Sequence, residues 1–329
     1  MSARKLAVTV LRLSIPAVAL LIALDLTVGV PGTWVVVISP SIVGFLAVVL
    51  VHRFTRAADR GPVEVAAPVT GRWSALNSPA DRTPSHGTHA YGQTYAIDIV
   101  AEPADQEGGA GSPGARPGFR WLWPVVRRNA DFPAFGAPIL AVADATVVRA
   151  GDGQRDHLSR GSLPALVYLM IVEALVRELM GVRRILGNHV VLDLGDGTYA
   201  LYGHLQKGSL TVREGDRVRT GQVIARCGNS GNTTEPHLHF QLMDGPDPVA
   251  DRGVPFTWRG LGVPRNKETF EAPEAPEAPE APEAPEAPEG PEAPETPEAP
   301  AGEGSDALAG GAPQTFPGEA PGALRGEAP

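Results

Sequence analysis

The amino-acid sequence predicts a mainly β domain with one inserted helix, preceded by a membrane segment and followed by a disordered tail. Three features carry this prediction: apolar segments broken by glycine run up to about Phe256, apolar stretches precede Val51, and a Glu-Ala-Pro repeat follows Glu271. Alternating apolar and polar residues between glycine-rich turns are typical of β-strands, whereas proline at every third position excludes a packed core. The expected parts are a membrane anchor, a globular domain and the tail, at residues 1–60, 61–262 and 263–329.

Two apolar stretches near the N-terminus predict a helical hairpin in a lipid bilayer. Residues 13–30 are apolar apart from Pro16 and Asp25, and residues 33–51 contain no charge. As a helix the second stretch is about 28 Å long, close to the thickness of the hydrocarbon core. A carboxylate at the centre of a bilayer costs about 2.5–3.5 kcal/mol, so Asp25 leaves open a single span formed by residues 33–51.

Three segments of the domain predict short strands. They are residues 138–151, 188–205 and 212–232, in which apolar residues recur between turns of glycine, aspartate or asparagine. Within the middle segment, Gly195-Asp196-Gly197 predicts a hairpin turn.

Residues 163–180 interrupt these strands and predict one inserted helix of five turns. Pro164 falls in the first turn, where a helix has no use for the missing backbone N–H. The helix is apolar nearly all round, so we expect it to pack on the domain, on a membrane or on a partner in the membrane.

The distribution of charge and cysteine excludes several classes of site. Residues 271–329 contain fourteen acidic residues and one basic residue, a net charge of −13, so residues 1–270 carry +4 although the chain carries −9. This small positive charge, without an aromatic and basic platform, predicts no nucleic-acid partner. The single cysteine, Cys227, excludes a disulfide within the chain and a multi-cysteine zinc site. A metal site must therefore use the eight histidines and the carboxylates.

Four residues of the predicted strands are candidates for chemistry. His237 and His239 are two positions apart, so on a strand they face the same side, about 6.5 Å apart. One of them can bind a metal ion while the other contacts its water or the substrate. His204 ends another predicted strand, and Asp98 places a carboxylate inside an apolar one, where it needs a cationic partner. Taken singly, each residue also has a purely structural explanation, so the combination carries the prediction.

The segments that hold these residues resemble the lysostaphin-type, or LytM-type, zinc peptidases, which have the duplicated-hybrid-motif fold and cut peptide cross-links of bacterial cell walls. The resemblance covers about residues 79–242, through FGAPILAVADATVVRAG, GNHVVLDLGDGTYALYGHL and VREGDRVRTGQVIARCGNSGNTTEPHLHFQL. It implies an antiparallel β-sandwich or half-barrel that binds zinc. It also implies that Asp98 and His239 are zinc ligands. His204 and His237 would orient or deprotonate the water on zinc and stabilise the oxyanion.

The sequence departs from this family at the first zinc ligand. That ligand is normally a histidine four residues before the aspartate, and Thr94 stands there. Threonine is a poor zinc ligand. His89 and His86 lie nine and twelve residues before Asp98, in a loop whose glycines allow it to fold back towards the strand. We expect His89, the nearer of the two, to be the third ligand; the alternative is a remnant with two ligands that binds no zinc.

The resemblance implies a membrane-anchored zinc-dependent endopeptidase that hydrolyses peptide cross-links of bacterial peptidoglycan. Its partners would be peptidoglycan peptides and the lipid bilayer. The alternative is a catalytically inactive relative that acts as a wall-binding regulator or scaffold. Zinc content distinguishes the two.

The expected location is the bacterial cell membrane, with the catalytic domain outside the cytoplasm as the resemblance implies. The charges favour the opposite side, because basic residues flank both ends of the predicted hairpin and none lies between its two stretches. These residues are Arg4, Lys5 and Arg12 before it, and Arg53, Arg56 and Arg60 after it. The sequence therefore does not decide on which side of the membrane the domain lies.

Overall fold

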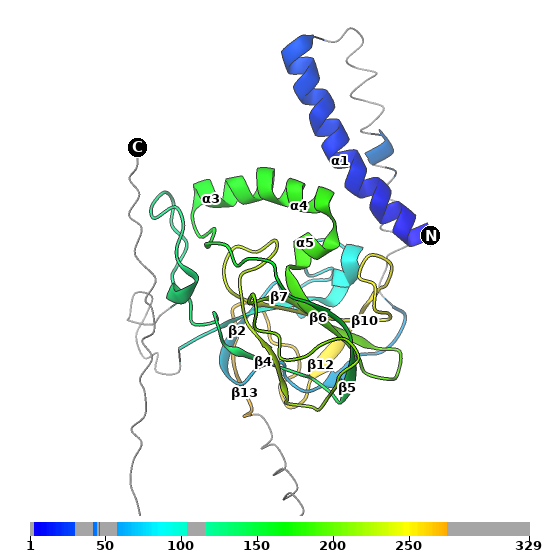
Figure 1. Ribbon diagram of the computed structural model, residues 1–329, viewed down its shortest axis with the longest axis vertical. Helices are drawn as coiled ribbons and strands as arrows, with labels where there is room; N and C mark the ends of the chain where they lie inside the picture. The colour runs from blue at the N-terminus through cyan, green and yellow to red at the C-terminus, as the bar shows by residue number, and fades with distance from the viewer. Residues whose placement is uncertain (1–2, 30–41, 45, 47–57, 104–115, 275–329) are drawn as a thin grey trace, which may run out of the picture. The chain divides into compact units, whose positions relative to one another are not determined.

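The structure is a computed structural model that describes residues 3–29, 42–44, 46, 58–103 and 116–274 (Figure 1). Its centre is a nine-stranded sheet, as predicted for a mainly β chain. The strands are β2 (Gly71–Leu76), β3 (Ile97–Ala101), β5 (Ala145–Gly151), β6 (Asn188–Asp193), β7 (Tyr199–Leu205), β8 (Arg217–Val218), β10 (Leu238–Met243), β11 (Gly253–Val254) and β13 (Thr269–Ala272). Their order is β13-β2-β3-β10-β7-β6-β5-β8, with β11 paired to β10, and the pairings are antiparallel.

Two small sheets accompany the large one. Strands β1 (Val63–Val65) and β12 (Phe256–Trp258) pair in parallel, and β4 (Pro138–Leu140) pairs with β9 (Val223–Arg226) in antiparallel fashion. The three predicted strand segments therefore become β4 and β5, β6 and β7, and β8 and β9. The antiparallel, mainly β prediction is confirmed.

The turn between β6 and β7 forms where the sequence predicts it. Gly195 and Gly197 have φ of +87° and +77°, a region that disfavours residues with a Cβ. Carboxylates stabilise the turn, because Asp193 Oδ1 accepts a hydrogen bond from the Gly195 amide at 2.8 Å and Asp196 Oδ1 accepts one from Thr198 at 2.9 Å.

Strand β10 separates the core from the candidate site. Phe240 belongs to the core, where its ring lies 5.4 Å from Tyr202 and 5.2 Å from Phe256. Because side chains alternate along a strand, His239 and Gln241 point to the other face. The buried core therefore fixes the direction in which His239 projects from β10.

The inserted segment is helical, but it is not one uniform helix. It comprises α3 (Leu163–Tyr168), a π-helical turn (Leu169–Glu173), α4 (Ala174–Met180) and α5 (Val182–Leu186). Ser162 caps the start, since its Oγ accepts a hydrogen bond from the Ala165 amide. Gly181, with φ of +99°, ends the predicted range and turns the chain into α5. Figure 1 shows α3 and α4 as one rod beside the sheet, with α5 below its end. Short 3₁₀ helices lie at Ala90–Tyr95 and Asn129–Asp131.

The prediction of a location in the cell membrane is contradicted. Searched over the described residues, the chain has no helix that is both long and apolar enough to cross a bilayer. Helix α1 (Ala3–Val28) has 26 residues but carries Arg4, Lys5, Arg12 and Asp25, and charged side chains are costly in hydrocarbon. The second predicted span, residues 33–51, lies outside the described residues apart from positions 42–44 and 46.

The sheet also continues past residue 262, where the sequence analysis placed the start of the tail. Strand β13 pairs with β2, with Phe270 opposite Trp73, and the ring of Phe270 lies 5.5 Å from Trp258. The domain therefore includes the first residues of the Glu-Ala-Pro repeat as an edge strand. Residues 275–329, the rest of the predicted tail, lie outside the described residues.

Candidate metal centre

Three neighbouring strands in the middle of the sheet bring the candidate residues together. His239 of β10 lies opposite Asp98 of β3 on one side and opposite Gly203 of β7 on the other. His204 follows Gly203 and adopts φ of +61°, which is uncommon for a residue with a Cβ. A Cβ on Gly203 would lie 3.4 Å from the Cβ of His239, which shows how closely β7 and β10 approach beside the imidazole. Antiparallel register thus joins residues that are more than 140 positions apart.

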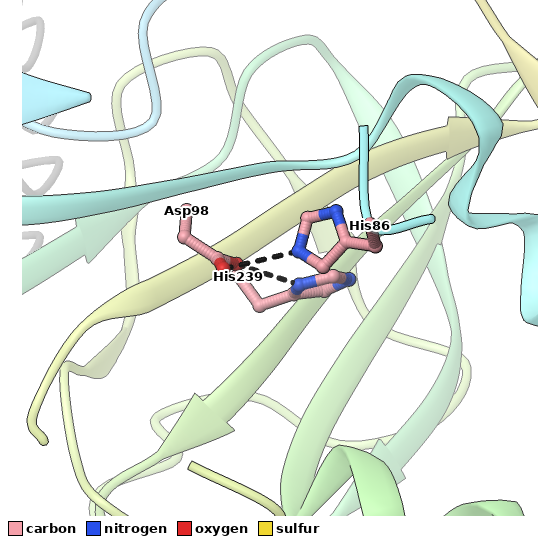
Figure 2. Close-up of side chains that lie close together, drawn as sticks. All are labelled: His86, Asp98 and His239. Carbon is pink, nitrogen blue, oxygen red and sulfur yellow. Dashed lines mark hydrogen bonds and ion pairs between the residues drawn. The ribbon is translucent and has the colours of Figure 1, made fainter. Parts of the chain in front are cut away.

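Asp98 is the centre of the cluster. Its Oδ1 lies 2.8 Å from Nδ1 of His239, and its Oδ2 lies 3.0 Å from Nε2 of His86 (Figure 2). Figure 2 shows both imidazoles approaching the same carboxylate. One ligand atom from each of the three residues falls within 4.8 Å of the others. Asn77 adds a hydrogen bond from Nδ2 to Oδ2 of Asp98, at 2.9 Å.

The neighbours of His239 determine which of its nitrogens carries a proton. Gln241 donates from Nε2 to the Tyr91 carbonyl at 2.9 Å, so its Oε1 is the acceptor that faces Nε2 of His239 at 2.9 Å. Nε2 of a neutral His239 therefore holds the proton. Its Nδ1 then presents a lone pair to Asp98.

The neighbours of His86 also determine which of its nitrogens carries a proton, and here it is Nδ1. Ser85 Oγ donates to the Ala96 carbonyl at 2.6 Å and lies 3.0 Å from Nδ1 of His86. Having used its single proton, this hydroxyl accepts a hydrogen bond from Nδ1. Nε2 of a neutral His86 therefore presents a lone pair to the second oxygen of Asp98.

This arrangement fits a divalent cation. Two imidazole lone pairs and a carboxylate converge, and only a proton or a metal ion between them removes the repulsion of acceptor against acceptor. Two histidines and one carboxylate form a ligand set that zinc accepts, with a fourth position left for water or substrate. Asn77, Ser85 and Gln241 hold the ligands in place.

His237 and His204 lie beside this cluster. Nε2 of His237 is 3.5 Å from Oδ1 of Asp98, and its ring centroid is 4.7 Å from that of His204. Nδ1 of His237 contacts the Glu235 carbonyl at 2.8 Å, and Nδ1 of His204 contacts the Ser230 carbonyl at 2.8 Å. A carbonyl only accepts, so both Nδ1 atoms donate. Nε2 of each ring is then left for the cleft.

The surroundings shift the pKa values of this group in different directions. Burial would raise the pKa of Asp98, but the charges that His86 and His237 carry when protonated, with hydrogen bonds from protonated His237 and His239, hold it well below its usual value. Burial lowers the pKa of His204 well below that of a free imidazole, and His237 lowers it further. Burial alone would lower the pKa of His237, but Asp98 raises it above its usual value. His204 is thus a neutral acceptor, and His237 holds a proton more readily.

A cleft of about 370 Å³ opens onto these side chains. Its lining includes Ala174 and Glu178 of α4 and Ile185 and Leu186 of α5, so the inserted segment forms one wall. Tyr91 donates a hydrogen bond from its hydroxyl to Glu178 and ties this wall to the loop before β3. The inserted segment therefore helps to shape the site.

The structure brings His86, and not His89, to Asp98. Nδ1 of His89 lies 3.0 Å from Oγ1 of the buried Thr94, and His89 is not among the residues that line the cleft. The geometry therefore favours His86 over His89, which the sequence analysis ranked first. Distance along the chain misled that ranking, because the 3₁₀ turn after His89 directs the nearer histidine away. Gln241 shares the two-residue period of His237 and His239, a signal that the sequence analysis did not use.

Comparison with known proteins assigns the family. The profile of Peptidase family M23 matches residues 171–251, which contain His204, His237 and His239. The glycyl-glycine endopeptidase ALE-1 of Staphylococcus capitis is 47% identical over 58 residues. The peptidoglycan DD-endopeptidase ShyA of Vibrio cholerae is 42% identical over 57 residues. Residues 171–251 therefore match peptidase family M23. The resemblance to lysostaphin-type peptidases is therefore confirmed.

These matches cover a small part of each protein. Each match spans 17% of this chain. The matched segments make up 16% of ALE-1 and 13% of ShyA. The structure of the antimicrobial peptidase lysostaphin from Staphylococcus simulans aligns over 36% of this chain and 38% of its own, with 24% identity and a TM-score of 0.24. The M23 match includes the histidines of β7 and β10 but neither Asp98 nor His86.

Proposed function

We propose that the M23 domain is a zinc-dependent endopeptidase that hydrolyses peptide bonds of bacterial peptidoglycan. The observation that carries this proposal is the convergence of the lone pairs of His86 and His239 on the Asp98 carboxylate, beside two further histidines in a cleft. The relatives named as endopeptidases of glycyl-glycine bonds and of peptidoglycan support the reaction and the substrate.

His86 Nε2, Asp98 and His239 Nδ1 would hold the zinc ion. Bound zinc lowers the pKa of a water molecule towards 7 and polarises the carbonyl of the scissile bond. The chain itself fixes the ligands: Ser85 and Gln241 select their tautomers, and Asn77 orients the carboxylate. A site prepared in this way loses little entropy when it binds the ion.

The two remaining histidines would move the protons. His204, whose burial keeps it neutral, accepts the proton of the attacking water at Nε2. His237, whose pKa Asp98 raises, donates a hydrogen bond from Nε2 to the developing oxyanion and then transfers that proton to the leaving amine. The proton that His204 took is lost to solvent, and His237 regains one from solvent. Ser230 and Glu235 hold the two rings through their carbonyls, so each ring keeps its Nε2 directed to the substrate.

The test measures zinc and hydrolysis in the full-length protein. We expect about one zinc ion per chain, and release of new amino groups from purified peptidoglycan that chelation abolishes and added zinc restores. His239→Ala should lose both zinc and hydrolysis, whereas the matched variant His189→Ala, a buried histidine outside the cleft lining, should keep both. Stoichiometric zinc in the His239→Ala variant would contradict the ligand assignment. Tight zinc binding without hydrolysis would favour the inactive, wall-binding alternative.

A further inference from the structure

A second cavity of about 370 Å³ lies between the loop before α3 and the inserted helical segment. Four arginines line it, namely Arg155, Arg160, Arg177 and Arg184, and we call it the Arg cavity. Glu173 is the one carboxylate among its described lining residues. The cavity thus holds three more positive than negative charges, although residues 1–270 carry only +4 in total.

Glu173 is already fully engaged by two of the arginines. Arg160 binds its carboxylate through Nε and Nη2, at 3.2 and 2.6 Å, and Arg177 Nη1 approaches it at 3.3 Å. The side chains of all three are at most 16% exposed. Arg155 and Arg184 are exposed, and neither forms an ion pair within the described part of the chain. Two guanidinium groups are therefore available to a ligand.

The charge is not balanced inside the cavity. Burial lowers the pKa of Arg177, and the neighbouring charge of Arg160 lowers it further although Glu173 opposes both. Crowded, partly desolvated guanidinium groups favour an oxyanion, which they bind through paired N–H groups. The Arg cavity therefore has the net positive charge and the N–H donors that an oxyanion needs.

The position of the cavity indicates where that anion comes from. Gly231 lines the Arg cavity and the next residue, Asn232, lines the catalytic cleft. Arg177 Nη1 donates to Oδ1 of Asn232 at 3.2 Å, which connects the two sites. Half-exposed Val172 and Val176 add an apolar wall that suits small aliphatic side chains.

We infer that the Arg cavity binds a carboxylate of an acidic peptide, and that this peptide is the substrate of the neighbouring cleft. This inference rests on the proposed function for the identity of the substrate. It does not rest on that function for the binding of the carboxylate. It assigns to the inserted segment a role in selecting peptides with free carboxylates and small apolar side chains.

The test compares two ligands and two double variants of the full-length protein. The ligands are a soluble cell-wall peptide fragment with free carboxylates and the same fragment with its carboxylates converted to amides. Arg155→Gln combined with Arg184→Gln removes the exposed pair. Arg213→Gln combined with Arg219→Gln is the matched control, with the same change of charge on exposed residues beside β8. Binding is measured by calorimetry and hydrolysis by KM and kcat.

We expect the Arg155 and Arg184 variant to bind the free-carboxylate fragment at least tenfold more weakly and to show a raised KM with unchanged kcat. Amidation of the fragment should also weaken its binding to the wild type at least tenfold, and should not change its binding to the variant. The comparison of the two fragments on the wild type does not depend on how the variant folds. Equal binding of both fragments by the wild type would overturn the inference, as would binding that depends on these arginines only with inorganic phosphate or vesicles of anionic phospholipid. Arginine-dependent binding without hydrolysis would support the carboxylate site in the Arg cavity, and would refute the proposed peptidase activity together with the assignment of the bound peptide as a substrate.

Discussion

Truncation of His86 distinguishes the metal centre described here from the one that chain distance favours. His86 contributes one of three ligand atoms that lie within 4.8 Å of one another. A structural zinc site binds with about 10–16 kcal/mol, which gives about 2.5–4 kcal/mol for each of four ligands. At 1.4 kcal/mol per factor of ten, His86→Ala should weaken zinc binding roughly 10²- to 10³-fold. Its side chain is only 15% exposed, so water replaces the imidazole poorly and compensates little of this loss.

The assay is competition for zinc against a chromophoric chelator, with His89→Ala as the matched control. His89 contacts Thr94 instead of Asp98, so His89→Ala should change zinc affinity by less than about tenfold. Circular dichroism and thermal unfolding of the chelated proteins show whether either variant has lost its fold. Normal zinc affinity in His86→Ala together with a large loss in His89→Ala would refute the assignment made from the structure and restore the one made from the sequence.

Three further predictions concern the catalytic cleft and the chain around it. His204→Ala and His237→Ala should retain zinc but lose hydrolysis by about 10²-fold or more, the scale of a general acid or base, and zinc loss equal to that of a ligand variant would show that their roles are misassigned. In the chelated protein the lowered pKa of His204 means that the unfolded chain binds the proton more tightly, so this residue's stabilising effect is present above about pH 6.5 and lost as the pH falls. The midpoint of urea unfolding should therefore decline less below pH 6.5 in His204→Gln than in the wild type, and parallel profiles would exclude this source. Gly187→Ala should lower the free energy of unfolding by about 1–3 kcal/mol, because its Cβ would lie 2.3 Å from the Ser230 carbonyl oxygen that holds His204. The rate of hydrolysis should fall as well. An unchanged midpoint of urea unfolding would contradict this close packing.

Much of the fold follows from local patterns in the sequence. Gly195 and Gly197 mark the turn between β6 and β7, and the apolar residues of residues 188–205 alternate with the period of a strand. Pro164 similarly marks where the inserted helix begins. Such signals need only neighbouring residues. They did not show that Thr269–Ala272 is a strand, because its evidence is the pairing with β2 across almost 200 residues.

The site divides in the same way. The two-residue spacing of His237 and His239 by itself places both side chains on one face of a strand, and the family motifs around them name the chemistry. The third ligand depended on the path of a loop, since His86 and His89 differ by three positions and both precede Asp98. The 3₁₀ turn Ala90–Tyr95, with Tyr91 and Gly92 at positive φ, directs His89 to Thr94 and leaves His86 on the carboxylate.

The sequence by itself predicted the antiparallel β domain, its resemblance to a known family and four of the five residues that we propose for the site, because these predictions use patterns and motifs within short segments. Only the tertiary structure showed that His86 contacts Asp98, and which tautomers direct two lone pairs at this carboxylate. It alone also showed that four arginines and one glutamate line the same cavity. Each of these is a contact between segments whose separation along the chain carries no information about their separation in space. The choice between two nearby histidines is therefore a property of the folded loop and of the sheet against which it packs.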